Sequence, residues 1–246
     1  MKRSTNCSYA VVLAVACLLL ASAVDLLAAE KSSAREVQSL DGTWEIVFDA
    51  ANQGRNAGWK VEANFTQLAG RRKIAVPSAW ELIEKDYEGV AFYRREFEVP
   101  AGWAEKIVRL QFGAVNYLAE IWLNGNAVGY HEGGFTPFEF RVDQVLKPGK
   151  TNVLMVRVVG PIMLSEKVVD GVGPMETPQW RGGLTGGIWQ SVKLVATGDV
   201  TVQDVFLTPN LTDSAATFHV ELAHTAVKGK SVDVVIDLAE AKDPSA

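Results

Sequence analysis

An all-β fold is predicted by three features of the 246-residue sequence. Short segments rich in β-branched and aromatic residues recur about every ten residues, and Gly, Pro, Asn or Asp bounds most of them. The pair Asn124-Gly125 separates two such segments, and strong helical periodicity is absent after the N-terminal region. These features favour an antiparallel sandwich or jelly roll, followed by part of a second β-domain.

The first 29 residues are predicted to be a secretory signal peptide. The basic residues Lys2 and Arg3 precede an apolar run over Tyr9–Leu20, which is too short to cross a bilayer comfortably. Ala21–Ala23 supplies a cleavage site of small residues, and Leu27–Ala29 supplies a second one. The sequence therefore predicts a secreted, periplasmic or cell-envelope protein. An uncleaved N-terminal membrane anchor is the alternative.

Composition excludes several classes of function. Both cysteines, Cys7 and Cys17, lie in the predicted signal peptide, so the mature chain is expected to have no disulfide and no thiol nucleophile. The three histidines are not spaced as metal ligands, and we expect no metal and no cofactor. The net charge of -5, without a basic cluster, argues against a nucleic-acid partner. No membrane contact is expected apart from the signal peptide.

The predicted strands begin after a loose polar segment over residues 30–38. Two short stretches, Trp80–Lys85 and Val142–Leu146, have helical or turn character instead. The strands predicted in this part are Thr43–Phe48, Phe92–Val99, Ile107–Phe112, Tyr117–Leu123, Ala127–Tyr130, Pro137–Val142, Val153–Val159 and Ile188–Val195.

Asn124-Gly125 is the clearest local signal in the chain. A two-residue type I′ turn requires positive φ at both positions, which Asn-Gly adopts at little cost. We therefore expect a tight hairpin between Tyr117–Leu123 and Asn126–Tyr130. A further turn is expected at Pro148-Gly149.

A domain boundary is predicted near Gly198-Asp199, so that the first sandwich covers residues 39–197. Beyond the boundary, residues 200–212, 216–227 and 231–240 have the composition of strands. They begin a second sandwich over residues 199–246, but a complete one needs about seven strands. The second domain is therefore expected to be incomplete, and the sequence is interpreted as a fragment.

The order of these segments resembles the N-terminal sugar-binding domain of glycoside hydrolase family 2, the family of β-galactosidases, β-glucuronidases and β-mannosidases. The resemblance covers residues 39–197, and the part after 199 looks like the start of the immunoglobulin-like domain that follows in that family. It is carried by SLDGTWEIVFD (Ser39–Asp49), VPSAWE (Val76–Glu81), YRREFEVP (Tyr93–Pro100), the run Val108–Phe140, PGKTNVLMVRV (Pro148–Val158) and GLTGGIWQSVKL (Gly183–Leu194).

The resemblance implies a galactose-binding-like jelly roll that accompanies a retaining glycosidase. In that family two glutamates on a (β/α)₈ barrel hydrolyse the β-glycoside, and their carboxyl groups lie about 5 Å apart. The sequence contains no βα alternation. We therefore expect no catalytic residue in this chain, with a β-glycoside and the missing barrel as its partners.

Aromatic side chains outside the strands are candidate sugar platforms. Trp80, Tyr87 and Trp180 lie in loop-like sequence, where they either face a ligand or cap the end of the sandwich. Trp44, Trp122 and Trp189 lie within strand-like runs and are expected to pack in the core or along the strands, while Trp59 and Trp103 are expected to be surface or corner anchors.

The longest irregular stretch, Asp170–Gly187, contains six glycines and is a candidate functional loop. By resemblance it runs toward the sugar pocket of the parent enzyme. Some β-galactosidases of the family have an acidic residue before the Trp-Arg pair, whereas this chain has Pro178-Gln179 there. The candidate sugar or interdomain contacts of this stretch are Glu176, Gln179, Trp180 and Arg181.

Three charged residues complete the candidate set. Of the adjacent arginines Arg94 and Arg95, one is expected to face solvent and the other to need a partner, since an unpaired buried charge is costly; Arg95 is a candidate interdomain contact. His131 and Glu132 lie in a predicted Gly-Gly loop, where they contact sugar or a neighbouring domain rather than catalyse. Pairing Glu132 with Glu139 as catalytic carboxylates is rejected, because nothing places them opposite each other.

The leading interpretation is the accessory sandwich of a secreted family 2-type glycosidase, inactive by itself. Two alternatives remain open. One is a free-standing carbohydrate-binding module, in which Trp80 or Trp180 would be essential for glycan binding. The other is a structural β-sandwich protein of the cell envelope, which would bind a protein partner without dependence on sugar.

Overall fold

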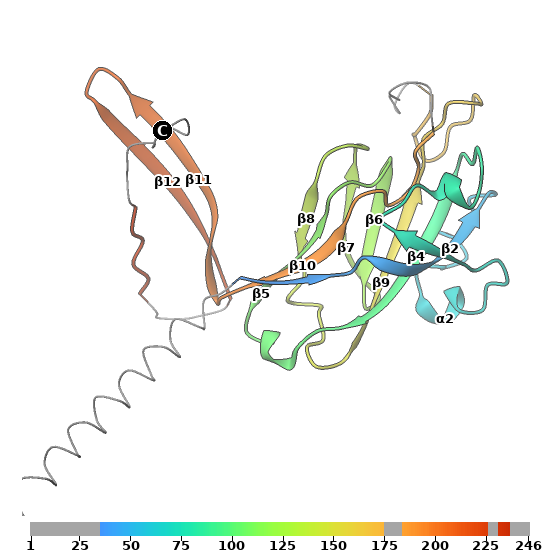
Figure 1. The fold of residues 1–246 in the computed structure, drawn as a ribbon, viewed down its shortest axis with the longest axis horizontal. Coiled ribbons are helices and arrows are strands. Elements are labelled where there is room, and N and C mark those ends of the chain that lie inside the picture. The colour runs from blue at the N-terminus through green and yellow to red at the C-terminus, as the bar shows by residue number, and fades with distance from the viewer. Residues whose placement is uncertain (1–34, 175–183, 226–230, 237–246) are drawn as a thin grey trace, which may run out of the picture.

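A computed structural model of the chain describes residues 35–174, 184–225 and 231–236 (Figure 1). The predicted signal peptide lies outside the described residues. Within them the chain forms two packed antiparallel sheets and a separate two-stranded hairpin. No helix in this part is long and apolar enough to span a membrane. The prediction of an all-β, antiparallel sandwich is confirmed.

The larger sheet has six strands in the order β3-β2-β4-β9-β6-β7, and the smaller has four in the order β1-β10-β5-β8. All neighbouring strands are antiparallel. The larger sheet contains β2 (Gly42–Asp49), β3 (Arg72–Val76), β4 (Val90–Glu98), β6 (Leu118–Leu123), β7 (Asn126–Glu132) and β9 (Thr151–Val159). The smaller contains β1 (Glu36–Ser39), β5 (Ile107–Phe112), β8 (Phe138–Arg141) and β10 (Val192–Thr197). Helical structure is limited to α2 (Glu62–Phe65) and the 3₁₀ turns Trp80–Leu82 and Ala101–Trp103.

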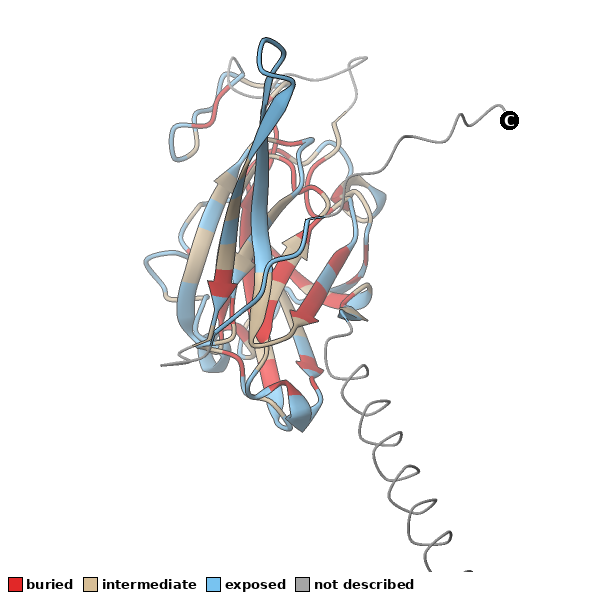
Figure 2. Ribbon diagram, turned by 90° about the vertical axis from the view of Figure 1, so that its left-hand side faces the viewer, coloured by how far each residue is buried: buried red, intermediate tan, exposed pale blue. Residues whose placement is uncertain are grey.

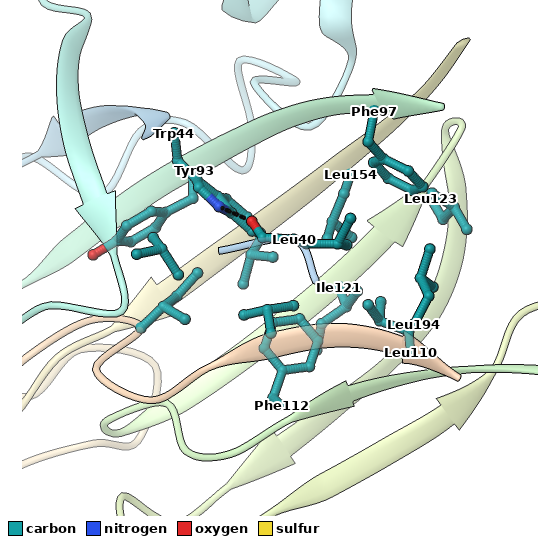
Figure 3. Close-up of a cluster of buried hydrophobic side chains, with 14 of the residues drawn as sticks. Leu40, Trp44, Tyr93, Phe97, Leu110, Phe112, Ile121, Leu123, Leu154 and Leu194 are labelled. Carbon is teal, nitrogen blue, oxygen red and sulfur yellow. Dashed lines mark hydrogen bonds between the residues drawn. The ribbon is translucent and has the colours of Figure 1, made fainter. Parts of the chain in front are cut away.

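The core lies between the two sheets and follows from the two-residue period of the strands. In β5, Leu110 and Phe112 point inward and are 1% exposed. Leu194 and Leu154 reach the same layer from β10 and β9 (Figure 3). Burial of each such side chain stabilises the fold by about 1.5–3 kcal/mol. The indole of Trp44 is also buried, and its Nε1 donates to the Leu40 carbonyl at 2.8 Å, so its one polar group is satisfied.

The predicted type I′ hairpin is present. Asn124 and Gly125 have φ of 53° and 82°, and Leu123 pairs directly with Asn126. The Asn124 side chain also donates to Asn152 Oδ1 at 2.8 Å and accepts from the Val153 amide at 3.0 Å. The turn residue therefore also ties the hairpin to β9. The turn expected at Pro148-Gly149 is present as well, with φ of 69° at Gly149.

Two predicted boundaries were wrong, and one strand was missed. Residues 36–38, expected to be loose, belong to β1, because their backbone pairs with β10 from Glu36↔Ala196 onward. Strand β3 was missed, since its charged start obscures the alternation that buries Ile74 and Val76. The strand expected from Ile188 begins only at Val192, because the Ile188 carbonyl accepts from the Ser78 amide instead of a ladder partner.

The second β-region is a long hairpin of β11 (Val200–Asn210) and β12 (Ala215–His224). Its side chains are mostly exposed, in contrast to the sandwich (Figure 2). The hairpin base is held by the Thr225 amide, which donates to the Asp199 carbonyl at 2.9 Å, and by Arg141, which donates to the His224 carbonyl at 3.1 Å. The expected third strand is wrong over its described part, since residues 231–236 pair with no neighbour that the structure describes; residues 237–240 lie outside the described residues.

Candidate functional site

Trp80 lies at the sandwich end from which the irregular stretch emerges, and it is fully buried. Glycine backbones press directly on its indole: a Cβ at Gly160 would lie 2.1 Å from Trp80 Cζ2, and one at Gly186 would lie 2.3 Å from Nε1. Phe48 packs edge-on at 5.8 Å between ring centroids. No face of the indole is open to a sugar, so Trp80 caps this end of the core.

Tyr87 packs beside Trp80, with 5.5 Å between the ring centroids. Its phenol donates to the Val90 carbonyl at 2.7 Å, and burial raises its pKa well above the ordinary value. Phe48 covers another side of the ring at 4.6 Å. The phenol is thus uncharged and committed to the backbone, which makes Tyr87 a structural neighbour of Trp80.

A polar clamp, made by Glu81 and Asn116, holds the chain where the irregular stretch returns to the sandwich. Both carboxylate oxygens of Glu81 accept from the Gly186 amide at 3.0 Å, and burial raises the Glu81 pKa. Asn116 Nδ2 donates to the Thr185 carbonyl at 2.8 Å, and its backbone exchanges two hydrogen bonds of 2.9 Å with Gly187. Sequence reasoning missed both residues, because their partners are distant in the chain. The partner of Asn116 lies about 70 residues away, and that of Glu81 lies 105 residues away.

The other end of the irregular stretch is held by a charged cluster on the outer face of the six-stranded sheet. The fully buried Arg157 donates to Glu120 at 2.7 Å and pairs with Asp170. Arg55 also contacts Glu120, at 2.7 Å. Burial opposes ionisation of Asp170, but Arg157 outweighs it and holds the Asp170 pKa below its usual value. Both ends of the stretch are thereby fixed to the sandwich.

Glu176, Gln179, Trp180 and Arg181 lie outside the described residues. Their roles as sugar or interdomain contacts stay predictions. The structure contributes the anchoring of the segment that carries them, at Asp170 before it and at Thr185–Gly187 after it.

His131 and Glu132 lie in strand β7, paired with β6, rather than in the Gly-Gly loop that was predicted. Because consecutive side chains of a strand point to opposite faces, the two residues cannot act on one reacting group. The His131 ring stacks on Phe138 with 4.1 Å between centroids, and burial lowers its pKa. Glu132 is exposed and accepts from the Tyr117 phenol at 3.2 Å.

The neighbouring glycines, Gly133 and Gly134, meet requirements of the backbone and of close packing. Gly133 has φ of 126°, and a Cβ at Gly134 would lie 2.3 Å from Asn116 Oδ1. Glu139 lies on β8 in the other sheet, apart from Glu132 on β7. The structure therefore supports the rejection of a Glu132–Glu139 carboxylate pair.

The two adjacent arginines of β4 differ in their partners. Arg94 points to the outer face and pairs with Glu45 at 2.9 Å, with Glu96 at 2.5 Å and with Glu62. Arg95 is half-buried and donates through Nη1 to the Thr43 carbonyl. Neither arginine is fully exposed, so the expectation that one faces solvent is wrong; the interdomain role of Arg95 stays a prediction.

Trp189, expected in the core or along the strands, is only half-buried, and its Nε1 donates to the Gly134 carbonyl at 2.8 Å. Its ring meets Phe135 edge-on at 5.7 Å, and Phe135 is 52% exposed. This aromatic pair was missed, because Phe135 follows two glycines and has no strand neighbour in the sequence. In the part of the chain that the structure describes, no three His, Cys, Asp or Glu side chains gather as metal ligands.

The chain is similar to known proteins both in sequence and in fold. Residues 84–198 match the family model described as "Glycosyl hydrolases family 2, sugar binding domain". A β-glucuronidase of Paenibacillus borealis is 26% identical over 72% of the chain and 32% of the relative, and a β-galactosidase of Thermoanaerobacter pseudethanolicus is 32% identical over 61% and 19%. A solved Ruminococcus gnavus β-glucuronidase, in complex with D-glucuronic acid, matches with a TM-score of 0.62 and 27% identity over 78% of the chain and 35% of that structure. The chain spans about a third or less of the length of these relatives.

Proposed function

Because residues 84–198 match the sugar-binding domain of glycosyl hydrolases family 2, we propose that the chain is the non-catalytic, sugar-binding region of a family 2 enzyme that hydrolyses β-glycosides. This proposal rests on the match over residues 84–198, because this range includes strands of both sheets and part of the sandwich end that holds the irregular stretch. The relatives are β-glucuronidases and β-galactosidases, which supports a β-linked uronide or galactoside as the substrate class of the parent enzyme.

In this role the sandwich end presents the segment after Asp170 to the sugar pocket of a catalytic barrel. Glu81 and Asn116 fix its return, while Arg157 fixes its start. Such anchoring reduces the conformational entropy that the segment would lose when it contacts substrate. The chemistry itself requires two carboxylates about 5 Å apart on a rigid scaffold, which we assign to a barrel outside this chain.

A hydrolysis assay tests the proposal. The chain, purified without any further domain, is incubated with chromogenic β-galactoside, β-glucuronide and β-mannoside, with a complete family 2 enzyme as the positive control. We expect no release of chromophore above the blank. Turnover that copurifies with the chain through two chromatographic steps would contradict a non-catalytic role.

We also propose that the protein is exported by the N-terminal segment. The support is its basic start, its short apolar run and its small-residue cleavage sites. Intact mass and N-terminal sequencing of the chain expressed in a bacterial host test this, and we expect a mature start after Ala23 or Ala29. A chain that keeps Met1 in the cytoplasmic fraction would contradict export.

A further inference from the structure

The outer face of the four-stranded sheet carries a groove made of two adjoining hollows. One hollow, of about 410 Å³, lies at the sandwich end between β5, β8 and the start of β10. The other, of about 330 Å³, continues toward the base of the β11–β12 hairpin. Gln111 and Glu139 line both, so the hollows are continuous. Each is in the size range of small-molecule sites, and their succession suits an elongated ligand.

Strand register places a row of polar side chains along this groove. Lys193 of β10 lies opposite Gln111 of β5, which lies opposite Glu139 of β8. Their chain neighbours Leu194 and Leu110 point into the core, so the three side chains point outward. Because neighbouring strands lie about 4.8 Å apart, the row offers a hydrogen-bonding group at each strand crossing.

The two ends of the row differ: Glu139 is held in place by its neighbours, whereas Lys193 is available to a ligand. Glu139 accepts from the Gln111 amide and pairs with Arg109 Nε at 3.2 Å, which fixes its carboxylate. Lys193 is exposed, and among the described residues no carboxylate lies within ion-pair distance of it. With Arg35, Arg109 and Lys193 against Glu139, the groove carries two net positive charges. Lys193 is the cation that the polar row itself offers to a ligand.

Pro137 and Phe138 provide the apolar part of the groove. Phe138 lies opposite Phe112 in the strand register, so its ring points toward the core, where it is stacked between Phe112 at 4.9 Å and His131 at 4.1 Å between centroids. An apolar lining beside a polar row suits a sugar, which has apolar C–H faces and a hydroxyl rim.

We propose that this groove binds an extended oligosaccharide strand, and that Lys193 selects strands bearing a uronic acid carboxylate. The choice of a glycan as ligand rests on the proposed function. Gln111 and Glu139 hydrogen-bond the hydroxyls, and Lys193 pairs with the carboxylate. His131 and Phe112 hold the Phe138 ring between them and are positioning residues.

Calorimetric titration of the full chain with two matched glycans tests the proposal. The probes are xylohexaose and a xylo-oligosaccharide of the same length that bears one glucuronic acid. We expect saturable binding of both, about tenfold tighter for the acidic glycan, because a charge-assisted hydrogen bond adds to the neutral contacts. Lys193→Ala should abolish the difference between the glycans, and Gln111→Ala should weaken both about tenfold. Lys150→Ala, an exposed lysine outside the groove, is the control.

Three results would overturn the proposal: no binding heat with either glycan, equal affinities for both in the unmodified chain, or the same loss of affinity in Lys150→Ala as in Lys193→Ala. Thermal unfolding of each variant separates lost binding from lost fold. Hydrolysis of either glycan would instead contradict the proposed function. Binding that groove variants leave unchanged would leave the proposed function standing and remove only the groove.

Discussion

The sandwich and the β11–β12 hairpin are both well-paired antiparallel β-structure, yet only one of them has a core. Phe112 of β5 is 1% exposed, whereas Phe206 of β11 is 62% exposed. β11 and β12 are paired along nearly their whole length, so backbone hydrogen bonding is not what separates the two regions. The difference is a second sheet to pack against, which supplies the hydrophobic stabilisation that a two-stranded ribbon lacks.

The largest expected effect tests this difference directly. Phe112→Ala should lower the free energy of unfolding of the sandwich by about 3–5 kcal/mol, since it removes a buried ring and leaves a cavity. Phe206→Ala, the matched change in the hairpin, should alter it by no more than about 0.5 kcal/mol. Urea unfolding followed by tryptophan fluorescence measures both. Comparable losses would mean that the hairpin face is covered.

A smaller effect tests the fixed end of the sandwich. Gly186→Ala places a methyl group against the Trp80 indole, and overpacking of this kind costs about 1–3 kcal/mol. Gly70→Ala is the control, because nothing lies within 4 Å of the added Cβ. Thermal unfolding of the two variants should separate them clearly. A neutral Gly186→Ala would show that the glycine backbone does not press on the indole.

The smallest effect depends on pH. The folded-state pKa of Asp170 lies below its unfolded value, so its pairing with Arg157 stabilises the protein above about pH 4. This stability is lost as the pH falls through the folded-state pKa. Asp170→Asn should therefore destabilise the chain at pH 7 by about 1 kcal/mol, and the difference from the unmodified chain should shrink toward pH 3. Urea titrations at the two pH values check this. A constant difference would exclude the ionised pair as its cause.

Local chemistry explains which features could be predicted from the sequence. The Asn124-Gly125 hairpin and the core strands are encoded in nearby residues, through turn conformation and two-residue alternation. β1 and the start of the strand predicted over Ile188–Val195 depend on long-range contacts, with β10 and Ser78 respectively. The sequence of residues 231–236 alternates as a strand should, but a strand also requires a neighbour to pair with.

The site was harder to predict, for a similar reason. Trp80 and Tyr87 were identified as aromatic residues in loop-like sequence, but Trp80 is buried by Gly160 and Gly186, which are distant in the chain, and Tyr87 by Phe48 and Trp80. Glu81 and Asn116 lie in segments that carry the family resemblance, but no local pattern marks them as partners of the returning segment, and only the fold brings them to it. Alternation could have indicated the outward row of Gln111 and Lys193, because their neighbours Leu110 and Leu194 are apolar.

Hydrogen exchange of the full chain, with and without the glucuronic-acid-bearing oligosaccharide, tests most directly the central claim that the sandwich is a self-supporting sugar-binding unit. Without glycan, amides of β5 and β9 should exchange orders of magnitude more slowly than those of β11 and β12, because they open only with the core. The glycan should slow exchange further at the groove strands β5, β8 and β10, and leave the hairpin beyond its groove-lining start at Val200–Gln203 unchanged. Equal protection of sandwich and hairpin, or protection by glycan of the hairpin alone, would contradict the account.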